Sequence, residues 1–116
     1  MILVNLTPHE INVITPSGVV NVPPSGDVAR VAMYSRSVDP LKIEHPDNDR
    51  FVDIPVRVST PGEVTGLPNP SHAKEFLVSG QVRAALPMRL DIYSPGPLVR
   101  NGAGQPIGCE GLEANS

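Results

Sequence analysis

The residues best suited to chemistry in this chain are its arginines. Seven arginines accompany only two lysines, and several of the arginines stand inside apolar runs. A planar guanidinium binds phosphate or carboxylate through two parallel hydrogen bonds, which a lysine ammonium cannot do. An arginine-biased set in an acidic protein therefore indicates discrete sites for a small anion.

Arg30, Arg57 and Arg100 are the strongest candidates for such a site. Arg30 and Arg57 each lie centrally in a predicted strand among valines, and Arg100 adjoins a predicted tight hairpin. A charge in such a position needs a partner, either a ligand oxygen or a carboxylate of a neighbouring subunit. Arg83 is a weaker candidate, on a short predicted helix whose N-cap is Ser79. The arginines that fit ordinary solvated or weakly paired positions are Arg36, Arg50 and Arg89.

No catalytic motif or metal site stands out. His9, His45, His72 and Cys109 lack the paired spacing of zinc ligands, so neither a metal nor a cofactor is expected. Cys109 fits a small core residue better than a nucleophile, and His9 fits a residue that caps or packs a turn. An enzyme stays open as an alternative, in which His9 or Asp91 transfers a proton and Cys109 is the nucleophile.

Length and composition predict one domain over residues 1–116. With 9 basic and 12 acidic residues the formal charge is −3, which argues against binding to polymeric nucleic acid or to an anionic membrane. The single cysteine, and the lack of an apolar stretch of spanning length or of a signal peptide, predict a cytoplasmic protein. Few aromatic residues leave a small aliphatic core, so we expect a homo-oligomer.

The elements that must position the arginines are short, because fourteen prolines and ten glycines interrupt the chain. The fold expected is mainly β, antiparallel and hairpin-rich, with one short helix at residues 80–86. An exposed loop is expected at about 39–50 and a frayed C-terminus at 113–116. The predicted strands are at residues 2–6, 11–15, 19–22, 28–35, 51–59, 76–79, 90–93, 98–100 and 105–112, with a brief pairing segment at 63–67.

Three local patterns sharpen this prediction. Thr7 followed by Glu10 resembles a capping box over one turn. Alternation in residues 51–59 points the aliphatic residues inward, and Pro55 within it favours an edge strand or a bulge. Asn101-Gly102 is the dipeptide best suited to a type I′ hairpin turn.

A series of turn-rich strings is similar to one group of small proteins encoded by bacteriophages and prophages. The strings are Asn5-Leu6-Thr7-Pro8-His9-Glu10-Ile11-Asn12, Pro23-Pro24-Ser25-Gly26, Ala29-Arg30-Val31, Thr65-Gly66-Leu67-Pro68, Phe76-Leu77-Val78-Ser79, Ser94-Pro95-Gly96-Pro97-Leu98-Val99-Arg100 and Ile107-Gly108-Cys109. Within this group the chain most resembles the first family of phage Thoeris anti-defence sponges. The likeness spans most of the chain.

The resemblance implies a non-enzymatic inhibitor that sequesters a cyclic nucleotide signal of bacterial immunity, chiefly a glycocyclic ADP-ribose isomer. It also implies a homo-oligomer, with hexamers among the relatives, and sites for cyclic di- or trinucleotides. Because adenine usually stacks on a planar side chain, Tyr34 or Phe76 is the expected base contact. Besides the enzyme acting on a nucleotide or nucleotide sugar, a phage structural or protein-binding module remains an alternative.

Overall fold

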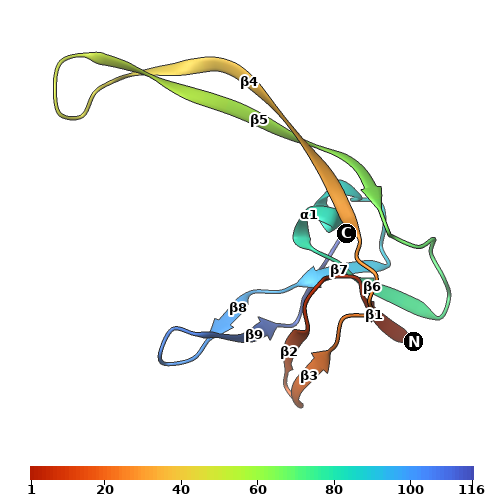
Figure 1. Cartoon of the computed structure of the whole chain (residues 1–116). Coiled ribbons are helices and arrows are strands. Elements are labelled where there is room, and N and C mark those ends of the chain that lie inside the picture. Colours follow the sequence, from red (N-terminus) through yellow and green to blue (C-terminus); the bar gives the residue numbers. More distant parts are fainter. The chain divides into compact units, whose positions relative to one another are not determined.

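The computed structural model describes all 116 residues and divides the chain into two compact units, each containing β-strands (Figure 1). We call Met1–Val31 with Glu63–Ser116 the core unit, and Ala32–Gly62 the arm. The single domain expected over residues 1–116 stays a prediction, because a division into compact units is not a division into domains. The prediction of a mainly β fold with one short helix is confirmed. At six residues, that helix is far shorter than the roughly 20 needed to cross a bilayer.

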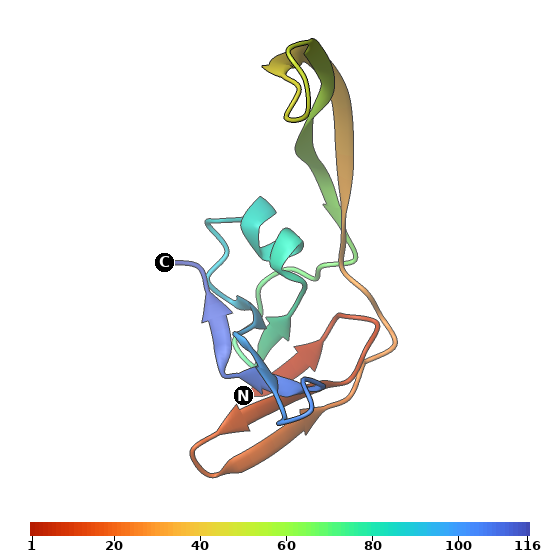
Figure 2. The same ribbon diagram turned by 90° about the vertical axis from the view of Figure 1, so that its left-hand side faces the viewer.

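The first sheet of the core unit has the strand order β1-β6-β7-β10 (Figure 2). Its strands are β1 (Ile2–Asn5), β6 (Lys74–Leu77), β7 (Ile92–Pro95) and β10 (Leu112–Ala114). The β1–β6 and β6–β7 pairs are parallel, and β7–β10 is antiparallel. The sheet therefore joins both ends of the chain to its middle.

The second sheet has the order β3-β2-β9-β8. Its strands are β2 (Ile11–Thr15), β3 (Gly18–Val22), β8 (Leu98–Arg100) and β9 (Pro106–Glu110). The hairpin predicted between residues 11 and 22 is confirmed, with Thr15 opposite Gly18 at the turn. The β2–β9 pair is parallel, so both sheets of the core unit mix parallel and antiparallel pairs, whereas the prediction was of antiparallel pairing.

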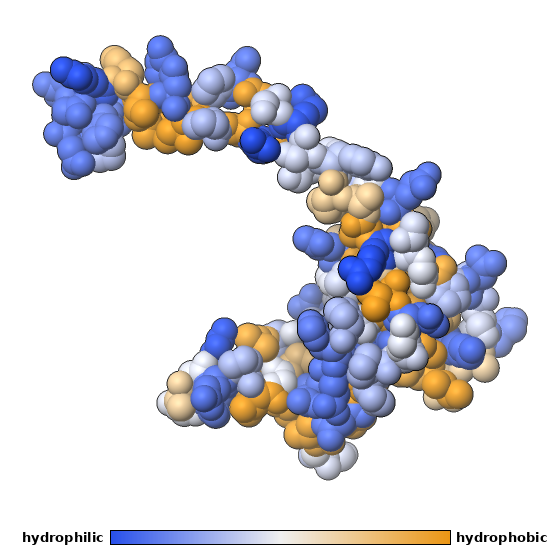
Figure 3. All heavy atoms as spheres, viewed as in Figure 1, coloured by the Kyte–Doolittle hydropathy of each residue, from blue (hydrophilic) through white to orange (hydrophobic).

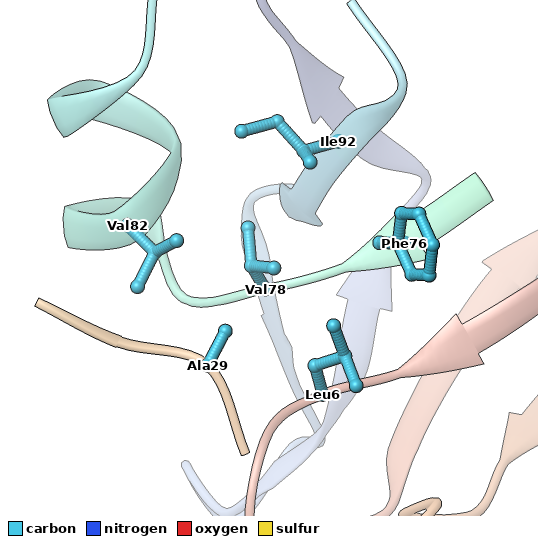
Figure 4. Close-up of a cluster of buried hydrophobic side chains, with 6 residues drawn as sticks. All are labelled: Leu6, Ala29, Phe76, Val78, Val82 and Ile92. Atoms are coloured by element: carbon cyan, nitrogen blue, oxygen red, sulfur yellow. The ribbon is translucent and has the colours of Figure 1, made fainter. Parts of the chain in front are cut away.

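Strand β6 and the residue after it lie at the centre of the core unit, because apolar side chains cover both faces. Phe76 and Val78 pack with Leu6, Val82 and Ile92 on one face, as Figure 4 shows. Leu77 points the other way, into a cluster with Val13, Val22 and Cys109 from the second sheet. A strand buried on both faces reads as a continuous apolar run, which Phe76-Leu77-Val78 is.

The helix α1 (Gly80–Ala85) begins where β6 ends and packs on β7. The predicted N-cap is confirmed, since Ser79 Oγ accepts a hydrogen bond from Val82 N at 3.2 Å. Its C-terminal carbonyls are satisfied by Asn115, whose Nδ2 donates to the carbonyl oxygens of Arg83, Leu86 and Arg89 at 2.9 to 3.3 Å. The C-terminus is therefore held by β10 and by this side chain, and the fraying expected at 113–116 is wrong.

A buried polar side chain, Asn5, ties the end of β1 to the loop that follows it. Asn5 is 1% exposed, and its Nδ2 donates to the carbonyl oxygens of His9 at 2.8 Å and Val22 at 3.0 Å. Its Oδ1 accepts from the backbone N of Thr7 at 2.9 Å and lies 2.7 Å from the Thr7 hydroxyl. The capping box expected from Thr7 is thus a turn organised by Asn5, with no helix after it.

Two predicted loops have different bounds in the structure. The strand β4 (Arg30–Glu44) continues well into the loop expected at 39–50, so that only residues 45–50 connect it to β5 (Phe51–Thr65). The predicted type I′ turn at Asn101-Gly102 is instead a five-residue loop. Asn101 Oδ1 accepts from the backbone N of Ala103 and Gln105, and Gly104, at φ +79°, is the residue with left-handed backbone.

Candidate functional site

A small pocket of the core unit brings together two of the residues that the sequence predicts to bind an anion. Arg30 and Ser79 line it with Gln81, and the remaining lining residues are Pro8, Val28, Ala29 and Val31. Arg30 enters from the first residue of β4, whereas Ser79 and Gln81 come from the start of α1. The sequence therefore predicted two of the three polar side chains of the pocket and missed Gln81, whose position two residues after the N-cap was the available signal.

The Arg30 guanidinium has no internal partner. It makes neither an ion pair nor a side-chain hydrogen bond within the chain, and Arg30 is exposed. The Ser79 hydroxyl accepts from Val82 N and keeps its own proton free to donate. A free guanidinium, a hydroxyl donor and an amide around one hollow suit the oxygens of a phosphate group.

The pocket holds about 190 Å³. Pockets that enclose a drug-sized ligand usually measure about 300–1,000 Å³. This one can therefore take a phosphate-bearing part of a nucleotide and leaves the rest of such a ligand uncovered.

The other two leading arginines do not line this pocket. Arg57 belongs to the arm and has no ion pair or side-chain hydrogen bond. Arg100 lies at the end of β8, where its Nη1 donates to the Gly104 carbonyl oxygen at 2.8 Å and helps to hold the five-residue loop. Arg30 and Arg100 were expected to converge on one ligand, but within the core unit only Arg30 lines this pocket.

Arg83 is a structural residue in this fold. Its Nε donates to Ser94 Oγ at 2.7 Å, and its two terminal nitrogens donate to Asn115 Oδ1 and to Glu113 Oε2, each at 3.2 Å. Every part of the guanidinium is therefore occupied by the β7 and C-terminal segments. Arg83 was expected to contact the ligand, but in the structure its hydrogen bonds join α1 to β10 and to the residue after it.

The two aromatic candidates differ in exposure. Phe76 is 1% exposed and lies in the apolar cluster of the core unit (Figure 4), so the base contact expected from it is wrong for this chain. Tyr34 lies in the arm and is exposed, with its ring against Gly62 of the neighbouring strand. A Cβ at Gly62 would collide with that ring, so the glycine makes room for the tyrosine.

The two side chains proposed as nucleophile and base differ in burial. Cys109 is buried at 4% exposure among Val13, Val22 and Leu77, whereas the His9 side chain is exposed and only its carbonyl oxygen takes part in the Asn5 turn. No three side chains of the types histidine, cysteine, aspartate and glutamate gather in a way that could hold a metal ion.

Asp91, the other proposed proton-transfer group, is paired with Arg89. Arg89 Nε donates to Oδ1 at 2.7 Å and Nη2 donates to Oδ2 at 2.8 Å and to the Pro68 carbonyl oxygen at 3.0 Å. The side-chain hydrogen bonds from Arg89 are the main cause that lowers the pKa of Asp91 below its usual value. A carboxylate held ionised in this way is poorly matched to proton transfer near neutral pH.

This pair predicts a specific loss of stability in acid. Because the pKa of Asp91 is lower in the folded than in the unfolded chain, its contribution is present above about pH 4, the unfolded pKa, and is lost as the pH falls through the folded value. Arg89→Met should cost about 1 kcal/mol at pH 6, and the difference from the unmodified protein should shrink towards pH 2. Thermal melts between pH 2 and 6 measure it. Lys74→Met, which removes an unpaired cation at an exposed position of the core unit, should give a small difference that stays constant with pH; an equally constant difference for Arg89→Met would contradict the assignment.

A second, larger pocket of about 360 Å³ is lined by residues of β2, β7, β8 and β9 and by residues beside them. Its walls are mostly apolar, with Ile11, Pro95, Leu98, Pro106 and Ile107 among them. The one charged side chain on its wall is Glu10, which repels anions. Size alone therefore does not make it the anion site.

The fold and the pocket together define a small mixed β protein with one unpaired guanidinium beside a phosphate-sized hollow. Comparison with models of known protein families, with curated proteins and with solved structures gave no match in any of the three.

Proposed function

We propose that this chain binds an anionic cyclic nucleotide, of the cyclic ADP-ribose type or a cyclic di- or trinucleotide, and sequesters it without chemical change. The observation that carries the proposal is the free Arg30 guanidinium on the wall of one pocket with Ser79 and Gln81. In line with the resemblance of the sequence to phage anti-defence sponges, the ligand would be an immune signal of an infected bacterium.

The chemistry required of such a binder is modest. Arg30 would donate two hydrogen bonds to phosphate oxygens, with Ser79 and Gln81 fixing the orientation of the group. Sequestration lowers the free concentration of a signal when sites outnumber signal molecules and dissociation is slow. It needs no general acid, base or nucleophile, which is consistent with an Asp91 held ionised by Arg89 and a Cys109 packed in the core.

The pocket, at about 190 Å³, is too small to enclose a whole dinucleotide. We therefore propose that the functional form is a homo-oligomer in which a second protomer covers the remainder of the ligand. Arg57 and Arg100, neither of which is paired with a carboxylate, are the candidates for further phosphate contacts across such a boundary, and Tyr34 for the base.

Calorimetric titration tests the proposal with cyclic ADP-ribose isomers and with cyclic di- and trinucleotides as probes. Arg30→Gln should weaken binding about 10- to 100-fold, because a hydrogen bond to a charged group contributes about 1.5–3 kcal/mol. Lys74→Gln is the matched control, since it removes one positive charge from an exposed residue of the core unit that does not line the pocket. Equal losses in both variants, or no binding of any probe by the unmodified protein, would overturn the proposal.

The same samples separate a binder from an enzyme. After incubation, heating releases the ligand and chromatography identifies it. Recovery of the intact probe supports sequestration, whereas a new product supports the alternative of a nucleotide-processing enzyme.

A further inference from the structure

The arm is a two-stranded ribbon that leaves an apolar face without a covering layer. It contains only segments of β4 and β5, which form a sheet of two strands. A lone two-stranded hairpin is marginally stable in water at best, and a third strand or a packed layer is usually needed to hold it. An ordered arm of this length therefore calls for a covering surface.

The side chains of the arm are sorted between its two faces. Lys42 Nζ and Asp53 Oδ1 lie 3.9 Å apart across the strands, and His45 N donates to the Arg50 carbonyl oxygen at 2.7 Å at the turn. Since neighbouring residues of a strand point to opposite faces, the face away from the Lys42–Asp53 pair carries an apolar set with Asp39 at its border, and Phe51 lies on the face of the pair. This apolar face consists of Leu41, Ile43, Val52, Ile54, Val56 and Val58.

None of these six side chains is fully buried. Ile54 is 40% exposed and Val58 is 37% exposed. The alternation predicted that these side chains point inward to a core, but no other part of the arm packs on their face. Figure 3 shows hydrophobic residues along the middle of the hairpin and hydrophilic residues at its turn. A contiguous apolar surface of this kind marks an interaction site.

The strands are poorly suited to growth at their edges. Pro40 in β4 and Pro55 and Pro61 in β5 cannot donate a backbone hydrogen bond. A partner strand added to either edge would meet a missing donor, which is how natural sheets block edge pairing. The face of the ribbon, rather than its edge, is thus the surface available to a partner.

The charges of the arm indicate what that partner is. The arm has four basic and five acidic residues, so it has no strong net charge that would select a nucleic acid or an anionic membrane. At the turn, Glu44, Asp47 and Asp49 outnumber Arg50, which leaves a net charge of −2. Along the rest of the arm the cations Arg36, Lys42 and Arg57 outnumber Asp39 and Asp53, which leaves a net charge of +1. When two arms run antiparallel, the acidic turn of each lies beside the basic middle of the other. The ribbon is therefore complementary in charge to a second copy of itself.

We infer that the arm is a docking surface for the arm of a second copy of this chain, with the two apolar faces packed against each other about a two-fold axis. Asp49 and Arg57 are eight residues apart, so aligning each with the other places the axis near residue 53, inside the apolar stretch. By the same alternation Arg57 projects from the outer face, and packed sheets lie about 10 Å apart, so this attraction acts over more than one screening length and salt should weaken it. The inference rests on the homo-oligomer of the proposed function and names the surface that builds it.

Mass measurement by size-exclusion chromatography with light scattering tests the inference. The unmodified chain should have at least twice its mass of 12.3 kDa, and Val56→Lys should reduce the oligomer to a smaller species. Ser59→Lys, an exposed residue on the opposite face of the same strand, is the matched control and should leave the mass unchanged. An oligomer that survives Val56→Lys overturns the arm as the interface but leaves the proposed oligomer standing. A monomeric unmodified protein overturns both.

Cross-linking provides a readout that does not depend on a destabilising charge. Ile54→Cys lies near the proposed axis and should join two chains through a short bismaleimide, whereas Ser59→Cys should not. The native Cys109, at 4% exposure, does not compete for the reagent. Equal cross-linking at both positions would contradict face-to-face packing. Ligand affinity measured on the same variants reports on the Arg30 pocket independently.

Discussion

Replacing Asn5 with alanine is expected to lower the free energy of unfolding by about 3 kcal/mol or more. The amide group donates to two backbone carbonyls and accepts from Thr7, and all of these groups are removed from water or partly so. Leaving a buried polar group without a partner costs about 1–3 kcal/mol for each group. Domains of this size are stable by only about 5–15 kcal/mol in total, so this one truncation removes a large share.

Urea denaturation followed by far-ultraviolet circular dichroism measures the effect, since the chain has no tryptophan. Asn21→Ala is the matched control, because Asn21 is an exposed asparagine of β3 whose side chain makes no hydrogen bond. It should change the stability by less than about 0.5 kcal/mol. If the two substitutions cost the same, the Asn5 network is not what holds the turn at residues 7–9.

Phe76→Ala is expected to have an effect of similar or greater size, about 3–5 kcal/mol, because it opens a cavity beside Leu6, Val78 and Ile92. Phe76→Leu should cost less and keep the core closed. The decisive point is that Phe76→Leu should lower the melting temperature and leave nucleotide affinity unchanged, since the ring cannot reach a ligand at 1% exposure.

Tyr34→Leu is the counterpart for an exposed aromatic residue. It should leave the thermal transition of the core unit nearly unchanged, and it should weaken nucleotide binding if Tyr34 stacks on the base. Thermal melts and calorimetric titrations of both variants separate the two roles. Loss of ligand binding in a folded Phe76→Leu protein would restore Phe76 as a contact residue.

Local patterns in the sequence predicted local structure well. The hairpin at residues 11–22 follows from β-branched arms around a glycine turn, and the helix start follows from the Ser79 cap. The parallel pairs β1–β6 and β2–β9 join segments far apart in the chain, and no short-range pattern encodes which distant strand is the partner. The length of the arm was missed because residues 39–50 are polar and show no alternation, which predicts a loop, whereas β4 extends to Glu44.

The candidate site was predictable in part. Arg30 stood out as a charge among valines and Ser79 as a helix cap, and both line the same pocket. Phe76 could have been excluded from the sequence, since the run Phe76-Leu77-Val78 is typical of a strand covered on both faces. The role of Arg83 could not have been predicted, because its partners Glu113 and Asn115 come from a segment with no recognisable sequence pattern.

The way Asn115 closes the end of α1 also bears on how the molecule is made. Synthesis proceeds from the N-terminus, so β1 cannot pair until β6 has emerged from the ribosome. The carbonyl groups at the end of α1 likewise lack the Asn115 amide until the last residues have emerged. The arm, by contrast, pairs residues that are close in sequence, so its pairing needs no later part of the chain. A nascent chain would thus expose the apolar face of its arm before the core unit has folded, which favours early contact between neighbouring chains on one polysome.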